Sequence, residues 1–333
     1  MKIKLFVLLI FCGAEDSIAQ GHLPHAPLFM TDDTLFMSIN TDMKSLLKSR
    51  TGKAVNYDGL LTLKEDNSEI KMKLRVRGNF RRSRANCHFP PIYLDFDKDD
   101  DEENDFLGQN EIKLVTPCKT DEYVLREFMV YKIFNLLAEN SFDVRLVRVT
   151  YIDSKGKRKT EEHLSFLLED QKLMTERLGL KKSDNRVFSQ ASISEMDMAT
   201  VGVFEYLIGN TDWSVPFRHN IKILETPDRR LITIPYDFDH GGLVNAPYAR
   251  PDEKLPIASI LNRLYVGAAY SKETYMAVFE KFQRIKPEIY ALYSDNPSFS
   301  DKYKKFAIKF IDEFYETIND EKKIEREFLI SRN

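Results

Sequence analysis

The spacing of apolar residues differs between the two halves of this chain. In the first half, apolar residues alternate with charged ones, as at Ile70, Met72, Leu74 and Val76. A period of two predicts strands with one face in water. Over residues 306–318, Phe and Ile recur at every fourth position, which predicts a helix packed on one side. We therefore expect an α+β fold, with strands mainly in the first half and helices in the second.

The same patterns predict most individual strands. The expected strands cover residues 56–63, 68–77, 92–96, 111–115, 144–152 and 163–168. Two further short strands should flank a turn at Pro227-Asp228. The acidic run over residues 97–105 lacks the glycine and terminal glutamate of an EF-hand loop, so we interpret it as a solvated hairpin tip.

Helices are expected in three places. One begins near Asp121 and has apolar residues spaced by four. A second should open at an S-x-x-E capping box, Ser192 to Glu195, and end near Gly209. Everything after Leu255 is expected to be helical.

The N-terminus has the pattern of a signal peptide. A positive start is followed by an apolar run over residues 5–12, which is too short to span a bilayer, and then by small residues at 17–19. We expect residues 1–20 to be removed on export to the periplasm, cell surface or medium; the alternative is a buried N-terminal helix. Phe11 before Cys12 argues against a lipoprotein. No later segment predicts a transmembrane helix.

Two cysteines, Cys87 and Cys118, remain after the signal peptide. In an exported chain they are expected to form a disulfide; the alternative is two buried free thiols. The 333 residues carry a formal net charge of −3, with a mean hydropathy of −0.39. This balance is typical of a water-soluble protein, and it lacks the basic excess of a nucleic-acid-binding one.

One segment combines the residue types that phosphoryl transfer needs. Asp212 follows the helix that ends near Gly209, Asn220 opens the first strand of the hairpin, and Asp237 and Asp239 end the second. The hairpin should bring Asn220 and Asp237 to the same end. A carboxylate can orient a hydroxyl, while an amide oxygen and a second carboxylate can hold Mg²⁺. Taken singly, such residues more often cap helices or close turns.

Six short motifs, in this order, resemble the CotH kinase family, the spore coat protein H-like branch of the protein-kinase-like superfamily. They are Arg77-Gly78-Asn79, Ile112-Lys113-Leu114, Leu125-Arg126-Glu127, Asn210-Thr211-Asp212, His219-Asn220 and Pro235-Tyr236-Asp237-Phe238-Asp239. The resemblance implies a two-lobed protein-kinase-like fold, with a β-rich N-lobe and a mainly helical C-lobe. It also implies ATP with Mg²⁺ or Mn²⁺, and transfer of phosphate to Ser or Thr hydroxyls of exported proteins.

The resemblance assigns roles to individual residues. Asp212 would be the catalytic aspartate. Asn220 and Asp237 would be metal ligands, with Asp239 as a possible helper. Lys113 would contact the nucleotide phosphates, and Glu127 would hold that lysine.

Two of these positions have their own support in the sequence. Lys113 alternates with apolar neighbours, so it should face away from the core; the alternative is an exposed strand lysine. Arg77 lies in a basic cluster around Gly78 that could cradle phosphates, or simply be solvated. The chain has no Gly-x-Gly-x-x-Gly loop, so the turn at Arg77-Gly78-Asn79 would have to cover the nucleotide.

The expected organisation is a signal peptide over 1–20, a nucleotide-side N-lobe over 21–169 and a C-lobe with the catalytic and metal loops over 170–333. Two other functions fit the sequence less well. One is a catalytically silent binding or structural protein of the cell envelope. The other is a metal-dependent hydrolase using His219 and His240, although no close histidine spacing supports it.

Overall fold

The computed structural model describes residues 25–96 and 104–330. The predicted signal peptide, residues 1–20, lies outside the described residues, as does most of the acidic run over 97–105. The account that follows is confined to the described ranges.

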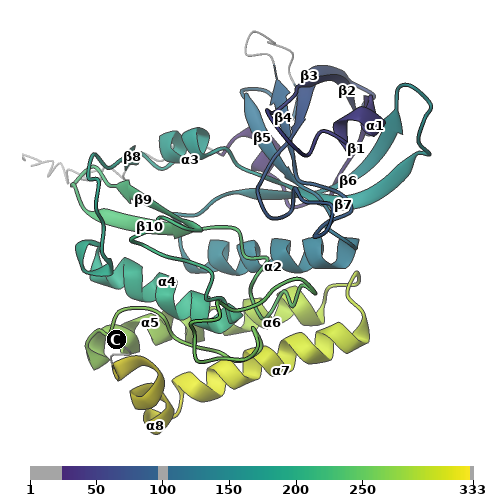
Figure 1. The fold of residues 1–333 in the computed structure, drawn as a ribbon. Coiled ribbons are helices and arrows are strands. Elements are labelled where there is room, and N and C mark those ends of the chain that lie inside the picture. The colour runs from purple at the N-terminus through teal and green to yellow at the C-terminus, as the bar shows by residue number, and fades with distance from the viewer. Residues whose placement is uncertain (1–24, 97–103, 331–333) are drawn as a thin grey trace, which may run out of the picture.

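Seven strands close into a barrel in the order β1-β2-β3-β4-β5-β7-β6 (Figure 1). Their bounds are β1 Leu35–Thr41, β2 Tyr57–Leu63, β3 Glu69–Val76, β4 Ile92–Phe96, β5 Glu111–Val115, β6 Val144–Asp153 and β7 Glu161–Leu168. Neighbouring strands are antiparallel except β1 and β6, which pair in parallel and close the barrel. Apolar side chains such as Ile92, Leu94 and Ile112 fill its interior.

The predicted two-lobed protein-kinase-like fold is wrong. The structure has instead a closed seven-stranded barrel, a small second sheet and eight α-helices among the described residues. The expectation failed because β1 was not predicted. Its inward residues Leu35, Met37 and Ile39 are buried, but Phe36, between Leu35 and Met37, is 47% exposed. An apolar side chain on the outer face hides the period of two by which a strand is recognised.

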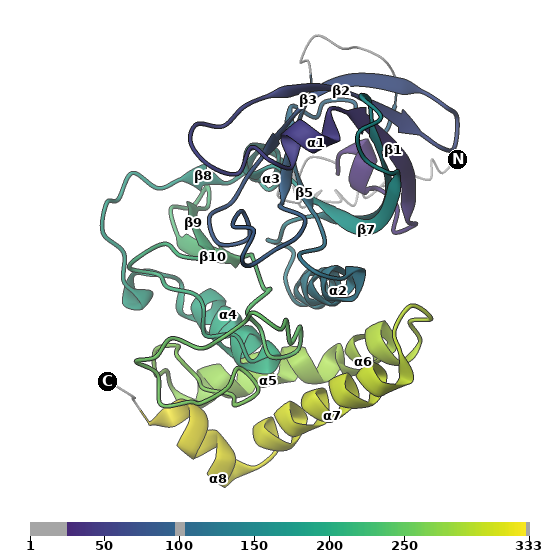
Figure 2. The ribbon, with the colours of Figure 1, turned by 45° about the vertical axis from the view of Figure 1, so that its right-hand side comes forward.

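The remaining elements form the helical part and the small sheet. The helices are α1 Met43–Leu46, α2 Asp121–Leu137, α3 Gln171–Arg177, α4 Glu195–Ile208, α5 Lys272–Arg284, α6 Lys286–Ser294, α7 Asp301–Ile318 and α8 Glu321–Ile324. The small sheet has the order β10-β9-β8, with β8 Lys181–Lys182, β9 Ile221–Glu225 and β10 Leu231–Pro235. Figures 1 and 2 show the barrel at the top, α2 directly beneath it and α5 to α8 at the bottom.

A second core joins α2 to the helices below it. Phe134 of α2 packs against Phe204 of α4 with ring centroids 4.8 Å apart and ring planes tilted by 57°. The ring centroids of Phe166 on β7 and Tyr131 on α2 lie 5.5 Å apart, so the same core also reaches the barrel strands. The barrel and the helices are therefore held together by continuous aromatic packing, with α2 between them.

Several sequence predictions are confirmed and two are wrong. The six predicted strands, the hairpin, the helix from Asp121 and the helix end near Gly209 are present. The capping box is wrong: Ser194 precedes α4, and Ser192 instead bonds to Ser189 in a short 3₁₀ turn. The chain after Leu255 is not helical throughout, because α5 begins only at Lys272.

The predicted disulfide between Cys87 and Cys118 is confirmed, with Cα atoms 4.4 Å apart. It joins the loop after β3 to the segment before α2, the two stretches on either side of β4 and β5. In the described ranges, no helix is both long and apolar enough for a membrane crossing.

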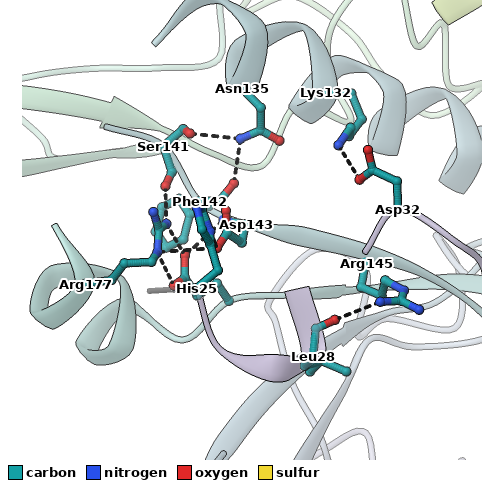
Figure 3. A network of polar contacts seen from close by, with 11 residues as sticks. His25, Leu28, Asp32, Lys132, Asn135, Ser141, Phe142, Asp143, Arg145 and Arg177 are labelled. Atoms are coloured by element: carbon teal, nitrogen blue, oxygen red, sulfur yellow. Dashed lines mark hydrogen bonds and ion pairs between the residues drawn. The ribbon is translucent and has the colours of Figure 1, made fainter. Parts of the chain in front are cut away.

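Polar contacts fasten the start of the described chain to α2 and to the segment before β6 (Figure 3). His25 Nδ1 lies 2.6 Å from Asp143 Oδ2, and Lys132 Nζ lies 2.7 Å from Asp32 Oδ1. Arg177 bonds the backbone oxygen of Ser141 at 2.9 Å, and it also bonds both carboxylate oxygens of buried Glu169. These contacts line a cavity of about 850 Å³. Its cations are thus already paired within the chain.

Candidate active site

The loop that carries Asp212 is held in place by the buried side chains of Glu205 and Asn210. α4 is capped by Gly209, which follows its last residue. Gly209 has a φ of 66°, a conformation that favours glycine, and its contact with Phe310 leaves no room for a side chain. The next residue, Asn210, donates to Glu205 at 2.9 Å and accepts from the backbone nitrogen of Asp212 at 3.0 Å. Burial raises the pKa of Glu205 to about 8. Asn210 therefore links the helix end to Asp212.

The carboxylate of Asp212 is held by two neighbours. Nδ2 of Asn220 lies 3.1 Å from Asp212 Oδ2 and 2.8 Å from the Asp212 backbone oxygen. His219 Nε2 lies 2.9 Å from Asp212 Oδ1. The structure thus brings Asp212 and Asn220 into contact.

The hairpin places Asp237 beside Asn220, at the end that the sequence predicted. Ile221 pairs with Pro235, and the backbone nitrogen of Tyr236 donates to the oxygen of Asn220 at 3.0 Å. Asn220 has a φ of 51° and Asp237 a φ of 66°. Such left-handed conformations are uncommon for non-glycine residues and concentrate at functional sites. On α2, Tyr131 Oη accepts from the Asp237 backbone nitrogen at 2.8 Å, which fixes this turn.

Lys113 reaches the same region from the barrel. Its neighbours Ile112 and Leu114 are fully buried inside the barrel, so the Lys113 side chain points outward, as predicted. Its Nζ lies 5.5 Å from the ring centroid of Tyr236 on the hairpin. Burial lowers the pKa of Lys113 to about 8, with the charges of Arg77 and Lys222 adding to the effect.

Lys113 belongs to a row of cations that runs from the barrel to the small sheet. We define the cation row as Arg77, Lys113, Lys222 and Lys182. Neighbouring members of the row act on one another. Burial, then the charges of Arg77 and Lys222, lower the pKa of Lys113, and burial, then the charge of Lys182, lowers the pKa of Lys222. Asp237 and Asp170 oppose the shift at Lys113 without cancelling it. The row therefore has an excess of positive charge that an anion would relieve.

The basic cluster around Gly78 does not act as one phosphate cradle. The guanidinium of Arg77, a member of the cation row, lies 5.2 Å from the ring centroid of Tyr93. Arg75 forms an ion pair with Glu111 instead, and Arg84 is exposed. Arg81 turns inward and is buried.

Buried Arg81 organises two of the predicted site carboxylates. Its Nη1 lies 3.3 Å from Glu127 Oε2 and 3.9 Å from Asp239 Oδ2. Tyr248 Oη donates to Asp239 at 2.9 Å. Burial raises the pKa of Glu127 and of Asp239, and at Asp239 the charge of Asp237 adds to it. Among the described ion pairs Glu127 is thus held by Arg81, where the resemblance implied Lys113.

Three polar groups of the site remain available to bind a ligand or a metal ion. Within the described ranges, no hydrogen bond or ion pair engages Lys113 Nζ, the Asp237 carboxylate or Asn220 Oδ1. Glu127 and Asp239, in contrast, are committed to Arg81 and Tyr248. Uncommitted hard oxygens on Asn220 and Asp237 suit Mg²⁺ or Mn²⁺, which is usually held by one or two carboxylates and substrate phosphates.

The histidines do not gather into a metal centre. His219 contacts Asp212, whereas the ring of His240 packs 5.7 Å from Phe80 and 6.0 Å from Tyr248. No three His, Cys, Asp or Glu side chains form a metal-binding group within residues 25–96 and 104–330.

Sequence reasoning missed Lys222 and Lys182, and it placed Arg81 in the basic cluster around Gly78 rather than in an ion pair with Glu127. Lys222 was visible as the charged residue between Ile221 and Ile223, two residues after Asn220. Alternation along the strand could have placed it on the side that faces Lys113. The sequence carried no comparable signal for Arg81. No family model matches this chain, and no curated protein sequence shows significant similarity to it.

Proposed function

We propose that this protein is a metal-dependent phosphotransferase that moves the γ-phosphoryl group of ATP to Ser or Thr hydroxyls of exported proteins. The observation that supports this proposal is the set of uncommitted groups, Lys113 Nζ, the Asp237 carboxylate and Asn220 Oδ1. Asn220 also contacts Asp212, and the charge of Asp237 acts on Lys113. Positive charge for phosphate, oxygen ligands for a cation and a carboxylate for the hydroxyl are the parts that phosphoryl transfer requires.

Each residue has a distinct task in this proposal. Lys113 and Arg77 bind phosphate oxygens of ATP. Asn220 and Asp237 would hold Mg²⁺ or Mn²⁺, which supplies charge neutralisation across the phosphates. Asp212 orients the acceptor hydroxyl and takes its proton, while the hydroxyl oxygen bonds to the γ-phosphorus and the bond to the β–γ bridging oxygen breaks. ADP leaves with that bridging oxygen. Arg81, Glu127 and Asp239 position the turn at Asp237.

Membership of the CotH kinase family and export are parts of the same proposal. The motif order supports the family. The disulfide between Cys87 and Cys118 supports export, because structural disulfides are typical of oxidising compartments. The direct test is transfer of a radioactive γ-phosphoryl group from ATP to protein with Mg²⁺ or Mn²⁺. Nucleotide binding without transfer would favour the catalytically silent alternative, and absence of both would remove the proposal.

The first prediction concerns Lys113. In Lys113→Met the Kd for ATP should rise by about 10- to 100-fold, because a hydrogen bond to a charged group contributes about 1.5–3 kcal/mol. Titration calorimetry measures this effect. Lys71→Met, an exposed lysine on β3, is the matched control and should leave the Kd unchanged.

We also expect the affinity for ATP to depend on pH through Lys113. Its pKa of about 8 means that the free protein loses this positive charge as the pH rises past 8. A bound phosphate favours charged Lys113, so the affinity of the wild type for ATP should fall above about pH 8. Lys113→Met should lack this decline. Equal declines in both proteins would show that Lys113 does not contact the nucleotide.

A further inference from the structure

The segment between Asp212 and Asn220 forms a small ordered loop. Ser214 and His219 exchange two backbone hydrogen bonds, of 3.0 and 2.9 Å. Inside this bridge Arg218 has a φ of 48°, and its nitrogen donates to Val215 at 3.1 Å. Phe217 lies at the tip, and its backbone nitrogen donates to Ser214 Oγ at 3.3 Å. The loop therefore holds Phe217 in a defined place.

Phe217 is one of a pair of unusually exposed apolar side chains. It is 86% exposed and Val187 is 87% exposed, the two highest values for large apolar residues in the described ranges. Arg218, which follows Phe217, donates a hydrogen bond of 2.8 Å to the backbone oxygen of Arg186, which precedes Val187. A single exposed apolar residue needs no explanation. Two of them, on stretches of chain that this hydrogen bond ties together, indicate a contact surface.

The surroundings of this pair are basic. Arg186 and Arg218 flank the two apolar residues, and Lys182 lies a short way along the chain from Val187. Asp184 is the acidic residue between Lys182 and Arg186. The local excess of positive charge complements a partner segment that carries carboxylates.

The loop also leads directly to the catalytic carboxylate. His219, at its base, lies 2.9 Å from Asp212. A chain segment resting on Phe217 is therefore close enough to present one of its own hydroxyls to Asp212. This places the apolar pair where an acceptor protein would approach.

We infer that Phe217 and Val187, with Arg186 and Arg218, form a docking surface for the acceptor protein. The surface takes an extended segment that has a large apolar side chain near its Ser or Thr and acidic residues on either side. The inference rests on the proposed function and deepens it by naming the class of substrate.

The experiment compares two synthetic peptides that share a central serine. One has Leu and Glu around it, and the other has Gly and Lys. Fluorescence polarisation should show at least tenfold tighter binding of the Leu and Glu peptide to the wild type. Phe217→Ser should lose that preference. Met276→Ser, an exposed apolar residue on α5, is the control and should keep it.

Phosphorylation of the same peptides separates the two proposals. With an active enzyme, Phe217→Ser should lower kcat/KM for the Leu and Glu peptide at least tenfold and leave the Kd for ATP unchanged. Equal binding of both peptides by the wild type, or an unchanged preference in Phe217→Ser, overturns the docking surface. Selective binding without any phosphorylation overturns the proposed transfer but retains the surface.

Discussion

Replacement of Asp212 by Asn should lower kcat for phosphoryl transfer by about 10²- to 10⁴-fold, the range for loss of a general base. The reason is that an amide cannot accept the hydroxyl proton. Asn can still form the contacts to His219 and Asn220 that hold the loop. The Kd for ATP should therefore change little. Radioactive phosphate transfer and titration calorimetry measure the two quantities.

The matched control is Asp228→Asn, at the opposite end of the same hairpin. Asp228 is exposed, and within the described part of the chain its carboxylate bonds only to Thr226 and Arg230 near the turn. Its variant should transfer phosphate at the wild-type rate. An Asp212→Asn protein with wild-type kcat would contradict the assigned role, and the proton acceptor would have to be another group.

Replacement of Arg81 by Met should lower the free energy of unfolding by about 3–5 kcal/mol, the usual cost of removing one partner from a buried ion pair. The Arg81 side chain is 9% exposed, and its partners Glu127 and Asp239 are 3% and 8% exposed. Without Arg81 both carboxylates stay buried and lose their ion-pair partner. Urea unfolding, monitored by circular dichroism, measures the loss.

The loss should also depend on pH. Burial already raises the pKa of Glu127 and of Asp239, and Arg81 opposes that shift. In the variant the folded state holds these protons more tightly than the unfolded state, so its stability decreases as the pH rises. The deficit should be smaller at pH 5 than at pH 8. Arg84→Met, in an exposed position of the same loop, should cost little at either pH. A pH-independent deficit would mean that lost packing, not charge, is responsible.

The approach of Asp212, Asn220 and Asp237 was predictable because the chain connects them locally. A turn between two short strands places the first residue of one beside the last of the other, and the register of Ile221 with Pro235 does so. The direction of Lys113 was predictable from simple alternation with its buried neighbours. In both cases the information lies within a few residues of sequence.

The closure of the barrel depends on contacts that sequence patterns do not show. β1 carries an exposed Phe36 on its outer face, and it pairs in parallel with β6, far along the chain. Such pairing is set by packing across the barrel rather than by local preference. The partner of Glu127 was hidden for a related reason. The predicted disulfide between Cys87 and Cys118 ties the loop that holds Arg81 to the segment before α2, but no local pattern directs the Arg81 side chain to Glu127.

The most direct test of the central claim is the binding of Mn²⁺ with ATP, followed by electron paramagnetic resonance. The account predicts that the wild type binds the Mn²⁺–ATP complex and that Asp237→Asn weakens this binding at least tenfold, while Asp228→Asn does not. An Asp237→Asn protein that binds the complex as tightly as the wild type would contradict the convergence of Asn220, Asp237 and Lys113 on one metal-bound nucleotide.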